Sequence, residues 1–374
     1  MGLWREQFTE SPGYLDFARV GPPSRAVVEE STALLTRVAA AGMSTVDELM
    51  TADARARAAV ARLCCAVDDR VVLLPHTSQG LFQAAFSVPS GEVLVSAAEF
   101  PANTYPWARA EQAGRITVRW LRGRVTPDAV AAALTPGTTA VSVSAVDFRT
   151  GYRADLAALR EVVGDRLLVV DGIQGVGVVD EPWEVADMLV CGGQKWLRSG
   201  WGIAFAVLSE RALERTDPLL SGWTGARDPG VFDDEIHELA PDARSWSVSN
   251  LSPVNAAALA RALELVEELG PVLVRQRIAD RVAELDELLR SVGAEIVSAT
   301  DRRAGILAFR MPGAAIEDVA AALAAEEVTA TVRPDQVRLS PHASTGQEAV
   351  DRVRAALSAL SGRRFQPIGP GRSG

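Results

Sequence analysis

The sequence contains a single lysine, Lys195, although Lys and Arg together number 38. A surface position that needs only a positive charge can use either residue. Lysine alone offers a primary amine whose pKa can be brought toward neutrality by burial, whereas a guanidinium stays protonated and is a poor nucleophile. We therefore predict that Lys195 takes part in chemistry rather than in surface electrostatics.

Asp171 is the second residue that points to chemistry. It ends an apolar stretch, L-L-V-V-D, and Lys195 follows just after the next short apolar stretch. In open α/β sheets, ligands bind at the carboxyl ends of the strands, so the two side chains are expected to meet at one sheet edge. An amine and a carboxylate so placed suit an aldehyde cofactor: the amine forms the Schiff base, and the carboxylate keeps a pyridine nitrogen protonated.

These residues belong to a series of short apolar runs that alternate with amphipathic helical stretches. Several runs are β-branched without polar alternation, as expected for strands covered on both faces of a parallel sheet. The predicted strands are 71–74, 92–96, 117–121, 140–144, 167–171, 188–191 and 203–208. The pattern predicts an α/β protein with a large, mostly parallel wound sheet and helices on both faces.

The pattern of apolar and polar residues changes near residue 253. Two long helical stretches, 255–268 and 272–292, come first. They are followed by predicted strands at 295–298, 306–311, 328–333 and 336–340 and by helices at 316–326 and 347–361. We predict a large domain over residues 1–250 and a smaller C-terminal α+β domain over 251–374. The segment 1–20 is expected to pack on the small domain, and the tail 365–374 is expected to be loose.

Composition excludes several classes of protein. The net charge of -10 and the absence of a basic cluster argue against a nucleic-acid partner. No apolar run approaches the roughly 18 to 20 residues of a membrane helix, and no targeting signal is visible, so a cytoplasmic protein is expected. The three cysteines, Cys64, Cys65 and Cys191, fit neither a disulfide framework nor a zinc site, and no metal site is expected.

Five motifs along the chain resemble those of one family. They read Y-L-D-F-A at 14–18, E-F-P-A-N-T-Y-P-W at 99–107, V-D-G-I-Q at 170–174, G-Q-K-W at 193–196 and V-R-L-S-P-H at 337–342. In this order they resemble the class V aminotransferase family of fold type I pyridoxal-phosphate enzymes, which also contains cysteine desulfurases, kynureninases and isopenicillin-N-epimerase-like proteins. The resemblance implies that the large domain binds pyridoxal 5'-phosphate and that Lys195 is the catalytic residue.

The resemblance also implies how the cofactor is held. Thr77 and Ser78 follow a strand and open a helix, where free N–H groups and the helix dipole favour a phosphate. Ordinary helix capping is the alternative for both. Gln194 matches a position whose side chain reaches the phosphate, while Gly192 replaces a serine often found there and so removes one hydroxyl donor. Phe100 matches the residue that stacks on the pyridine ring.

Four further residues are placed by the resemblance. Gln174 is expected to donate to the phenolic oxygen of the cofactor, and Asp147 to approach the ring from a neighbouring loop. Arg338 matches the arginine that binds the substrate carboxylate, for which its planar fork is suited. Arg19 stands where relatives often carry a small residue, so it is expected to bind a second acidic group of the substrate.

A further set of residues concerns the quaternary structure. Trp223 and the pair Ser249 and Asn250 correspond to stretches that relatives project toward the cofactor of the neighbouring subunit. Ser249 and Asn250 stand where Gly-Thr is common. The resemblance therefore implies a homodimer with shared active sites.

Other functions fit the sequence less well. The glycines at 172–177 are spaced G-x-x-G-x-G, the reverse of the dinucleotide fingerprint, and the three histidines are too scattered for a metal hydrolase. Desulfuration through a persulfide needs a cysteine on a loop of the second domain, yet no cysteine follows Cys191.

Several activities on an amino acid substrate stay open. Transamination, Cβ elimination of the kynureninase or cysteine-lyase type and Cα epimerisation all begin with an external aldimine, so the sequence separates them poorly. We favour an aminotransferase, with a lyase second and an epimerase third. Outside the enzymes, a non-catalytic regulatory protein that binds pyridoxal phosphate is the alternative.

Overall fold

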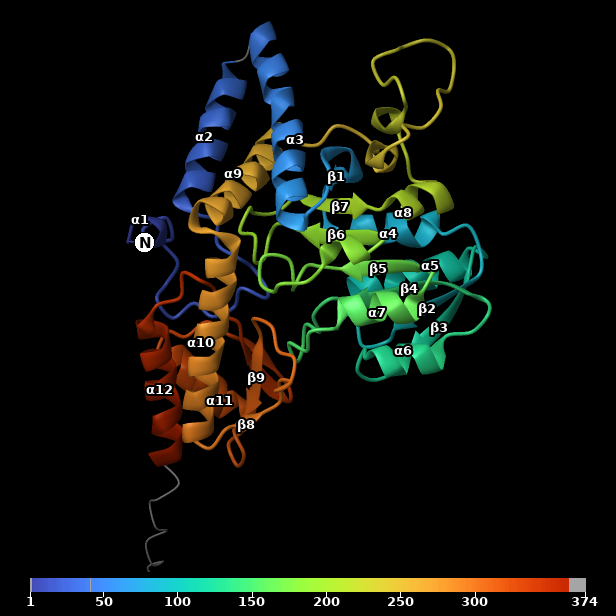
Figure 1. Cartoon of the computed structure of the whole chain (residues 1–374). Coiled ribbons are helices and arrows are strands. Elements are labelled where there is room, and N and C mark those ends of the chain that lie inside the picture. Colours follow the sequence, from blue (N-terminus) through green and yellow to red (C-terminus); the bar gives the residue numbers. More distant parts are fainter. Residues whose placement is uncertain (1, 41, 363–374) are drawn as a thin grey trace, which may run out of the picture.

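A computed structural model describes residues 2–40 and 42–362, so the tail expected over 365–374 lies outside the described residues. The structure contains two sheets (Figure 1). The large sheet is built from the first two thirds of the chain, and the small sheet from the last third. None of the described helices is long and apolar enough to cross a membrane.

The large sheet has seven strands in the order β1-β7-β6-β5-β4-β2-β3. Strand β7 is antiparallel to both neighbours, whereas β6, β5, β4, β2 and β3 pair in parallel. The strands are β1 (Val71–Leu74), β2 (Glu92–Ser96), β3 (Thr117–Leu121), β4 (Thr138–Ser144), β5 (Leu167–Asp171), β6 (Met188–Gly192) and β7 (Ala204–Leu208). The predicted mostly parallel wound sheet is confirmed.

Helices cover both faces of this sheet. Because successive residues of a strand point to opposite faces, Val169 and Val170 of β5 join different apolar clusters. Leu81 of α4 packs in the cluster of Val169, and Leu159 of α7 in that of Val170. The helices near this sheet are α4 (Thr77–Ser87), α5 (Tyr105–Gln112), α6 (Pro127–Ala133), α7 (Leu156–Val163) and α8 (Glu210–Arg215). Burial on both faces explains why the strands lack polar alternation.

Two long helices near the N-terminus are not among the predicted elements. After the short α1 (Gly2–Arg5), α2 (Arg25–Ala39) and α3 (Met43–Cys64) stand beside α9 (Pro253–Leu269) (Figure 1). Arg55 and Arg62 of α3 form ion pairs with Glu264 and Glu267 of α9. The buried face of α3 is made largely of alanines, so its apolar periodicity is weak in the sequence.

The small sheet is antiparallel, in the order β10-β11-β9-β8. Its strands are β8 (Glu295–Ile296), β9 (Leu307–Arg310), β10 (Thr331–Arg333) and β11 (Gln336–Leu339), and its helices are α10 (Pro271–Ser291), α11 (Ile316–Ala325) and α12 (Gln347–Gly362). These elements lie where the sequence predicts a compact α+β region. The domain boundary at residue 250 stays a prediction, since α9 follows it in the chain but packs on α2 and α3.

The N-terminal segment 13–18 runs along the small sheet. The backbone N–H of Leu15 donates to the carbonyl oxygen of Thr329 at 2.9 Å, and the N–H of Ser340 donates to the carbonyl oxygen of Leu15 at 2.7 Å. Tyr14 and Asp16 form parallel bridges with Thr329 and Ser340. A segment that precedes the large sheet in the chain is therefore held by the last elements of the chain.

Candidate active site

Lys195 lies in the loop that follows β6, at the carboxyl edge of the large sheet. The N–H of Gly193 donates to the carbonyl oxygen of Ile203 at 3.0 Å, and the N–H of Gly21 donates to that of Gln194 at 2.8 Å. A Cβ atom at Gly21 would lie 1.8 Å from the carbonyl oxygen of Lys195. Only glycine allows so close an approach, which fixes the N-terminal segment against the lysine loop.

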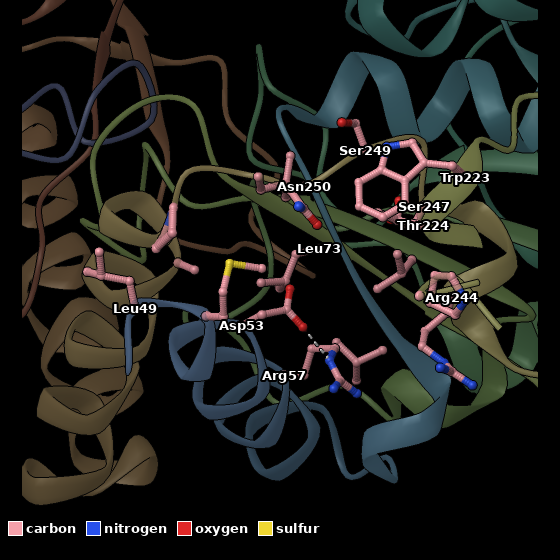
Figure 2. Close-up of a pocket in the computed structure, with 18 residues that line it drawn as sticks. Leu49, Asp53, Arg57, Leu73, Trp223, Thr224, Arg244, Ser247, Ser249 and Asn250 are labelled. Atoms are coloured by element: carbon pink, nitrogen blue, oxygen red, sulfur yellow. Dashed lines mark hydrogen bonds and ion pairs between the residues drawn. The ribbon is translucent and has the colours of Figure 1, made fainter. Parts of the chain in front are cut away.

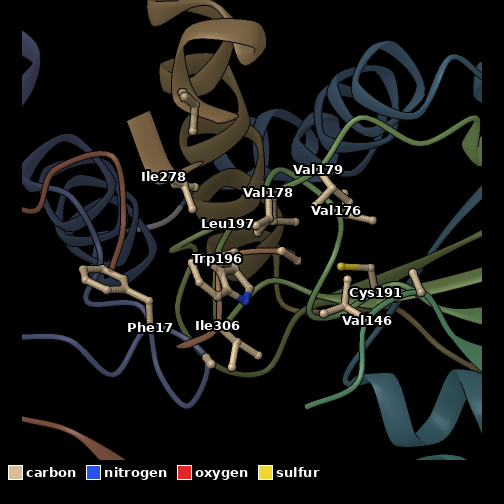
Figure 3. Packing of buried hydrophobic residues seen from close by; sticks show 14 of the residues in the cluster. Phe17, Val146, Val176, Val178, Val179, Cys191, Trp196, Leu197, Ile278 and Ile306 are labelled. Atoms are coloured by element: carbon tan, nitrogen blue, oxygen red, sulfur yellow. The ribbon is translucent and has the colours of Figure 1, made fainter. Parts of the chain in front are cut away.

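The next residue along, Trp196, anchors this loop in the core (Figure 3). Its side chain is buried and stacks on His342, with ring centroids 6.3 Å apart. A Cβ atom at Gly305 would lie 2.6 Å from the Trp196 ring, so the indole fits closely against the segment that precedes β9. The backbone that carries the amine is thus held by both sheets.

The electrostatics of Lys195 favour a reactive amine. Burial lowers the pKa of Lys195 to about 8, the charge of Asp171 opposes that shift, and Arg338 adds to it. The carboxylate of Asp171 is itself buried, which raises its pKa, and it accepts a hydrogen bond from the N–H of Ile173 at 3.0 Å. The structure therefore brings the lysine and the aspartate close enough for their charges to interact. The pKa of the amine, about 8, lies close to neutral pH.

Phe100 lies beside the amine. The Nζ atom of Lys195 is 5.6 Å from the centre of the Phe100 ring, which is 47% exposed. Phe148 packs edge-on against Phe100, with centroids 5.3 Å apart. An exposed aromatic face next to the reactive amine is available to a planar ligand.

Polar groups suited to a phosphate converge at the start of α4. Thr77 is the first residue of this helix, and the His76 ring accepts a hydrogen bond from the N–H of Gln79. The Thr77 hydroxyl is buried and has no hydrogen-bond partner among the described residues. A Cβ atom at Gly192 would lie 2.4 Å from the Gln194 Oε1 atom and 2.6 Å from the Thr77 Oγ1 atom.

Gly192 therefore leaves room for the Thr77 hydroxyl and the Gln194 amide beside it. A serine side chain at this position would displace the Thr77 hydroxyl or the Gln194 amide. Ser78, the second residue of α4, is partly exposed, and the first N–H groups of a helix have no acceptor within the helix. The Thr77 hydroxyl, without a partner in the described part of the chain, and these N–H groups are therefore available to an anion such as a phosphate.

Gln174 is more constrained than the sequence suggests. Its Nε2 atom donates to the carbonyl oxygen of Ala18 at 2.9 Å, and its Oε1 atom accepts from the indole N–H of Trp196 at 2.7 Å. One N–H of the amide stays available to a ligand. Its contact with the phenolic oxygen of the cofactor stays a prediction.

Arg338 of β11 is buried, and part of its guanidinium already makes hydrogen bonds within the protein. Its guanidinium donates to the carbonyl oxygen of Phe148 at 2.7 Å and to the Thr331 hydroxyl at 3.0 Å, and it lies 3.4 Å from the Asp16 carboxylate. Its Nε atom has no partner among the described residues. Arg19 is exposed, and its charge is felt by Arg338. Arg338 is therefore near enough to Lys195 for its charge to lower the pKa of the amine, and Arg19 is near enough to Arg338 to act on it in the same way.

Asp147 is engaged in its own loop. Its carboxylate accepts hydrogen bonds from the backbone N–H groups of Arg149 at 2.7 Å and Thr150 at 2.9 Å, and it pairs with the Arg149 guanidinium. It lines a cavity of about 380 Å³ together with Glu99, and Lys195 is not part of that lining. Its approach to the cofactor ring stays a prediction.

Trp223, Ser249 and Asn250 lie together but not with Lys195. They line a cavity of about 420 Å³ with residues of β1 and α3, and Lys195 is not part of its lining (Figure 2). Trp223, in the short helical turn Trp223–Gly225, is 50% exposed. These three residues thus form a separate surface.

Two residues near the site were assigned no role from the sequence. Glu99, the first residue of the 99–107 motif, accepts hydrogen bonds from the Ser144 N–H at 2.9 Å and from its hydroxyl, and burial raises its pKa to about 7. Arg198 adopts φ 58° and binds the Pro22 carbonyl oxygen, Ser344 and Glu10. The motif was the only signal for Glu99, and nothing in the sequence singles out Arg198 among so many arginines.

Comparison with known proteins agrees with this geometry. The profile of the family described as class V aminotransferases matches residues 14–336, and the chain belongs to that family. Members of this family use pyridoxal phosphate, in agreement with the cofactor expected from the sequence.

Curated relatives carry out different reactions. The chain is 28% identical to a kynureninase from Deinococcus radiodurans, an alignment that covers 82% of this chain and 79% of the relative. It is 26% identical to isopenicillin N epimerase from Streptomyces clavuligerus, covering 91% and 93%. A probable cysteine desulfurase from Aeropyrum pernix is 29% identical over 63% of this chain and 61% of the relative.

Solved structures confirm the fold. The cystine C-S lyase C-DES in complex with its product cysteine persulfide matches with a TM-score of 0.84 at 19% identity, over 93% of this chain and 97% of the other. The apo cysteine desulfurase from Thermococcus onnurineus matches with a TM-score of 0.81 at 19% identity, over 94% of each chain. The fold type I architecture expected from the sequence is therefore confirmed.

Proposed function

We propose that the protein is a pyridoxal-phosphate-dependent enzyme that acts on an amino acid, and that it catalyses transamination. The observation that carries the proposal is the pairing of Lys195, whose amine has a pKa of about 8, with the buried carboxylate of Asp171. When bound, the cofactor supplies an electron-accepting ring that stabilises negative charge on the substrate Cα.

The residues present fit this cofactor. Lys195 is available to its aldehyde carbon and Asp171 to its pyridine nitrogen, while Phe100 offers a ring face. The buried Thr77 hydroxyl, which has no hydrogen-bond partner among the described residues, suits the phosphate, and Gln194 and Ser78 lie near it. Gln174 has one amide N–H left for the phenolic oxygen.

Lys195 is also the proposed proton carrier. Phe100 cannot accept a proton, and the amine beside it has a pKa near the ambient pH, which suits general acid–base catalysis. Transamination requires a proton to leave one carbon and reach another on the same face, a task that one flexible amine can perform. Arg338 is proposed to hold the substrate carboxylate through the planar guanidinium group, whose Nε atom has no hydrogen-bond partner among the described residues.

A Cβ lyase is the second candidate. It is supported by the kynureninase among the curated relatives and by the likeness to the C-S lyase structure. An epimerase is third, supported by the isopenicillin N epimerase relative. Desulfuration through a persulfide is disfavoured because no cysteine follows Cys191 in the sequence.

We further propose a homodimer in which each subunit completes the other's active site. Support comes from Trp223, Ser249 and Asn250, which gather on a surface that Lys195 does not share. Exposed apolar side chains follow in the same stretch of chain, with Phe232 86% and Ile236 100% exposed. A second copy that covered this region would remove that apolar surface from water.

A screen of amino acids with product identification tests the proposed reaction. Transamination predicts a keto acid together with the aminated cofactor. Release of ammonia or of a side-chain fragment would establish the lyase instead, and racemised substrate would establish the epimerase. The Lys195→Ala protein is the control, because it lacks the proposed proton carrier.

A further inference from the structure

Two arginines close to Arg338 have no acidic partner. Within residues 2–40 and 42–362, neither Arg333 nor Arg19 forms an ion pair, although both are near enough for Arg338 to feel their charges. The pKa of Arg338 is lowered by burial and then by these two positive neighbours, against the raising effect of Asp16. The region thus carries positive charge that no carboxylate in the described part of the chain pairs with.

The small sheet turns Arg333 toward the active site. In the antiparallel pair β10 and β11, Thr331 lies opposite Arg338 and Arg333 lies opposite Gln336. Residues two apart on a strand share a face, so Arg333 and Arg338 point to the same side of the sheet. That side faces the loop that contains Phe148, whose carbonyl oxygen accepts a hydrogen bond from Arg338.

A continuous line of contacts joins Arg333 to the catalytic amine. The Arg333 guanidinium lies 5.0 Å from the centre of the Phe148 ring, which packs edge-on against Phe100. Phe100 in turn lies 5.6 Å from the Lys195 Nζ atom. The Nε atom of Arg333 is buried without a hydrogen-bond partner among the described residues.

The neighbouring carboxylates already form ion pairs with other arginines. Asp16 pairs with Arg338, and Asp147 pairs with Arg149, whose guanidinium lies 5.7 Å from the centre of the Phe148 ring. A buried N–H donor without an acceptor costs free energy that an anionic ligand would recover. If the substrate α-carboxylate occupies Arg338, the charge on Arg333 and Arg19 still lacks a counterpart.

We infer that the amino acid substrate carries a second anionic oxygen group on its side chain, and that Arg333, assisted by Arg19, binds it. The inference rests on the proposed function for the identity of the substrate as an amino acid. The chemical class is an acidic side chain ending in a carboxylate, sulfinate or sulfonate. Arg333 is thereby a specificity-determining residue of the site.

Matched substrates test this inference. The holoenzyme and its Arg333→Gln variant are assayed with L-aspartate and L-glutamate and with the uncharged isosteres L-asparagine and L-glutamine. We expect the variant to raise KM at least tenfold for an acidic substrate, with kcat changed less than about twofold and the values for the amides unchanged. Arg333→Lys keeps the charge and should recover part of the affinity.

The control is Arg290→Gln, which removes an exposed arginine of α10 that pairs with Asp286. It should leave every KM unchanged. An equal change of KM for acids and amides in the Arg333 variant, or no change for either, would overturn the inference. So would a preference of the parent enzyme for the amides.

Direct binding separates this inference from the proposed function. Calorimetric titration of the holoenzyme with succinate and glutarate, against butyrate and valerate, measures recognition of the second anionic group without turnover. Tighter binding of the dicarboxylates that Arg333→Gln abolishes would support the inference even if no amino acid reacted. Equal binding of mono- and dicarboxylates would overturn it even if transamination were found.

Discussion

The lysine site and the Trp223 cavity differ in how their side chains are held. Around Lys195, groups from β5, α4 and the loop after β6 are buried, and that burial shifts the pKa values of Lys195 and Asp171. In the Trp223 cavity, which the edge strand β1 helps to line, the tryptophan is half exposed. The first region is buried within one chain, whereas the second presents half-exposed side chains at the surface, where we propose that a second subunit packs.

Removing the lysine is the strongest test of the difference between the two regions. We expect Lys195→Ala and Lys195→Arg to lower kcat by about 10³-fold or more, because neither replacement offers a nucleophilic amine at neutral pH. Steady-state assays measure the loss. Borohydride treatment of the parent protein should fix the cofactor at Lys195 alone, since no other lysine exists. Substantial activity in either variant would contradict the catalytic role.

Asp171→Asn should have the next largest effect, about 10²-fold on kcat, because an amide cannot keep a pyridine nitrogen protonated. Asp171 also favours the charged form of Lys195, so its loss should lower the pKa of the amine further below about 8. The pH profile of kcat/KM reports both changes. A variant with parental kcat would leave Asp171 as a structural residue only.

The Trp223 cavity can be tested by subunit mixing. Lys195→Ala and Asn250→Ala are each expected to be weakly active. If each subunit completes the other's site, random hybrids restore one intact site in each heterodimer and recover about a quarter of the parental activity. Refolding the two variants together and measuring activity against each alone provides the readout. Failure of the mixture to exceed the parents would leave the cavity without a role in catalysis.

The pH dependence of labelling tests how burial acts on the amine. Lys195 should lose its proton near pH 8 in the cofactor-free protein, so its reactivity rises with pH and reaches half its maximum there, rather than near the ordinary lysine value of about 10.4. Modification by an amine reagent is followed by peptide mass spectrometry at residue 195. A midpoint above about pH 10 would show that burial leaves the amine unperturbed.

Gly192→Ala should give the smallest effect. The added methyl group would push aside the Thr77 hydroxyl or the Gln194 amide, and we expect the affinity for pyridoxal phosphate to fall about fivefold. Spectral titration of the apo protein measures the dissociation constant. Unchanged affinity would show that these two groups do not hold the phosphate.

The sequence predicts most of the sheet framework because the strands are apolar on both faces and are bounded by polar residues. It also predicts the proximity of Lys195 and Asp171, since Asp171 ends β5 and Lys195 follows β6, whose carboxyl ends lie at the same edge. It misses α2 and α3, because a helix face made of alanines gives little apolar periodicity. Burial of an amine or of a carboxylate depends on packing, so the pKa values could not be read from local sequence.

Other features depend on contacts between distant residues. The hydrogen bonds of Gln174 to Ala18 and Trp196 and those of Glu99 to Ser144 join different segments, and no local motif encodes them. Likewise, local sequence does not reveal that Arg333 lies on the Phe148 ring and has no acidic partner among the described residues. The roles of the individual site residues stay predictions until the variants are measured.

The pairing of residues 13–18 with the small sheet has a consequence for biosynthesis. Asp16 is translated well before its partner Arg338, which lies 322 positions later in the chain. Contacts of such sequence separation form late, because the closing loop must be ordered first. The contact between Asp16 and Arg338 can therefore form only after Arg338 has been translated, so a product terminated before that residue would lack this part of the proposed site.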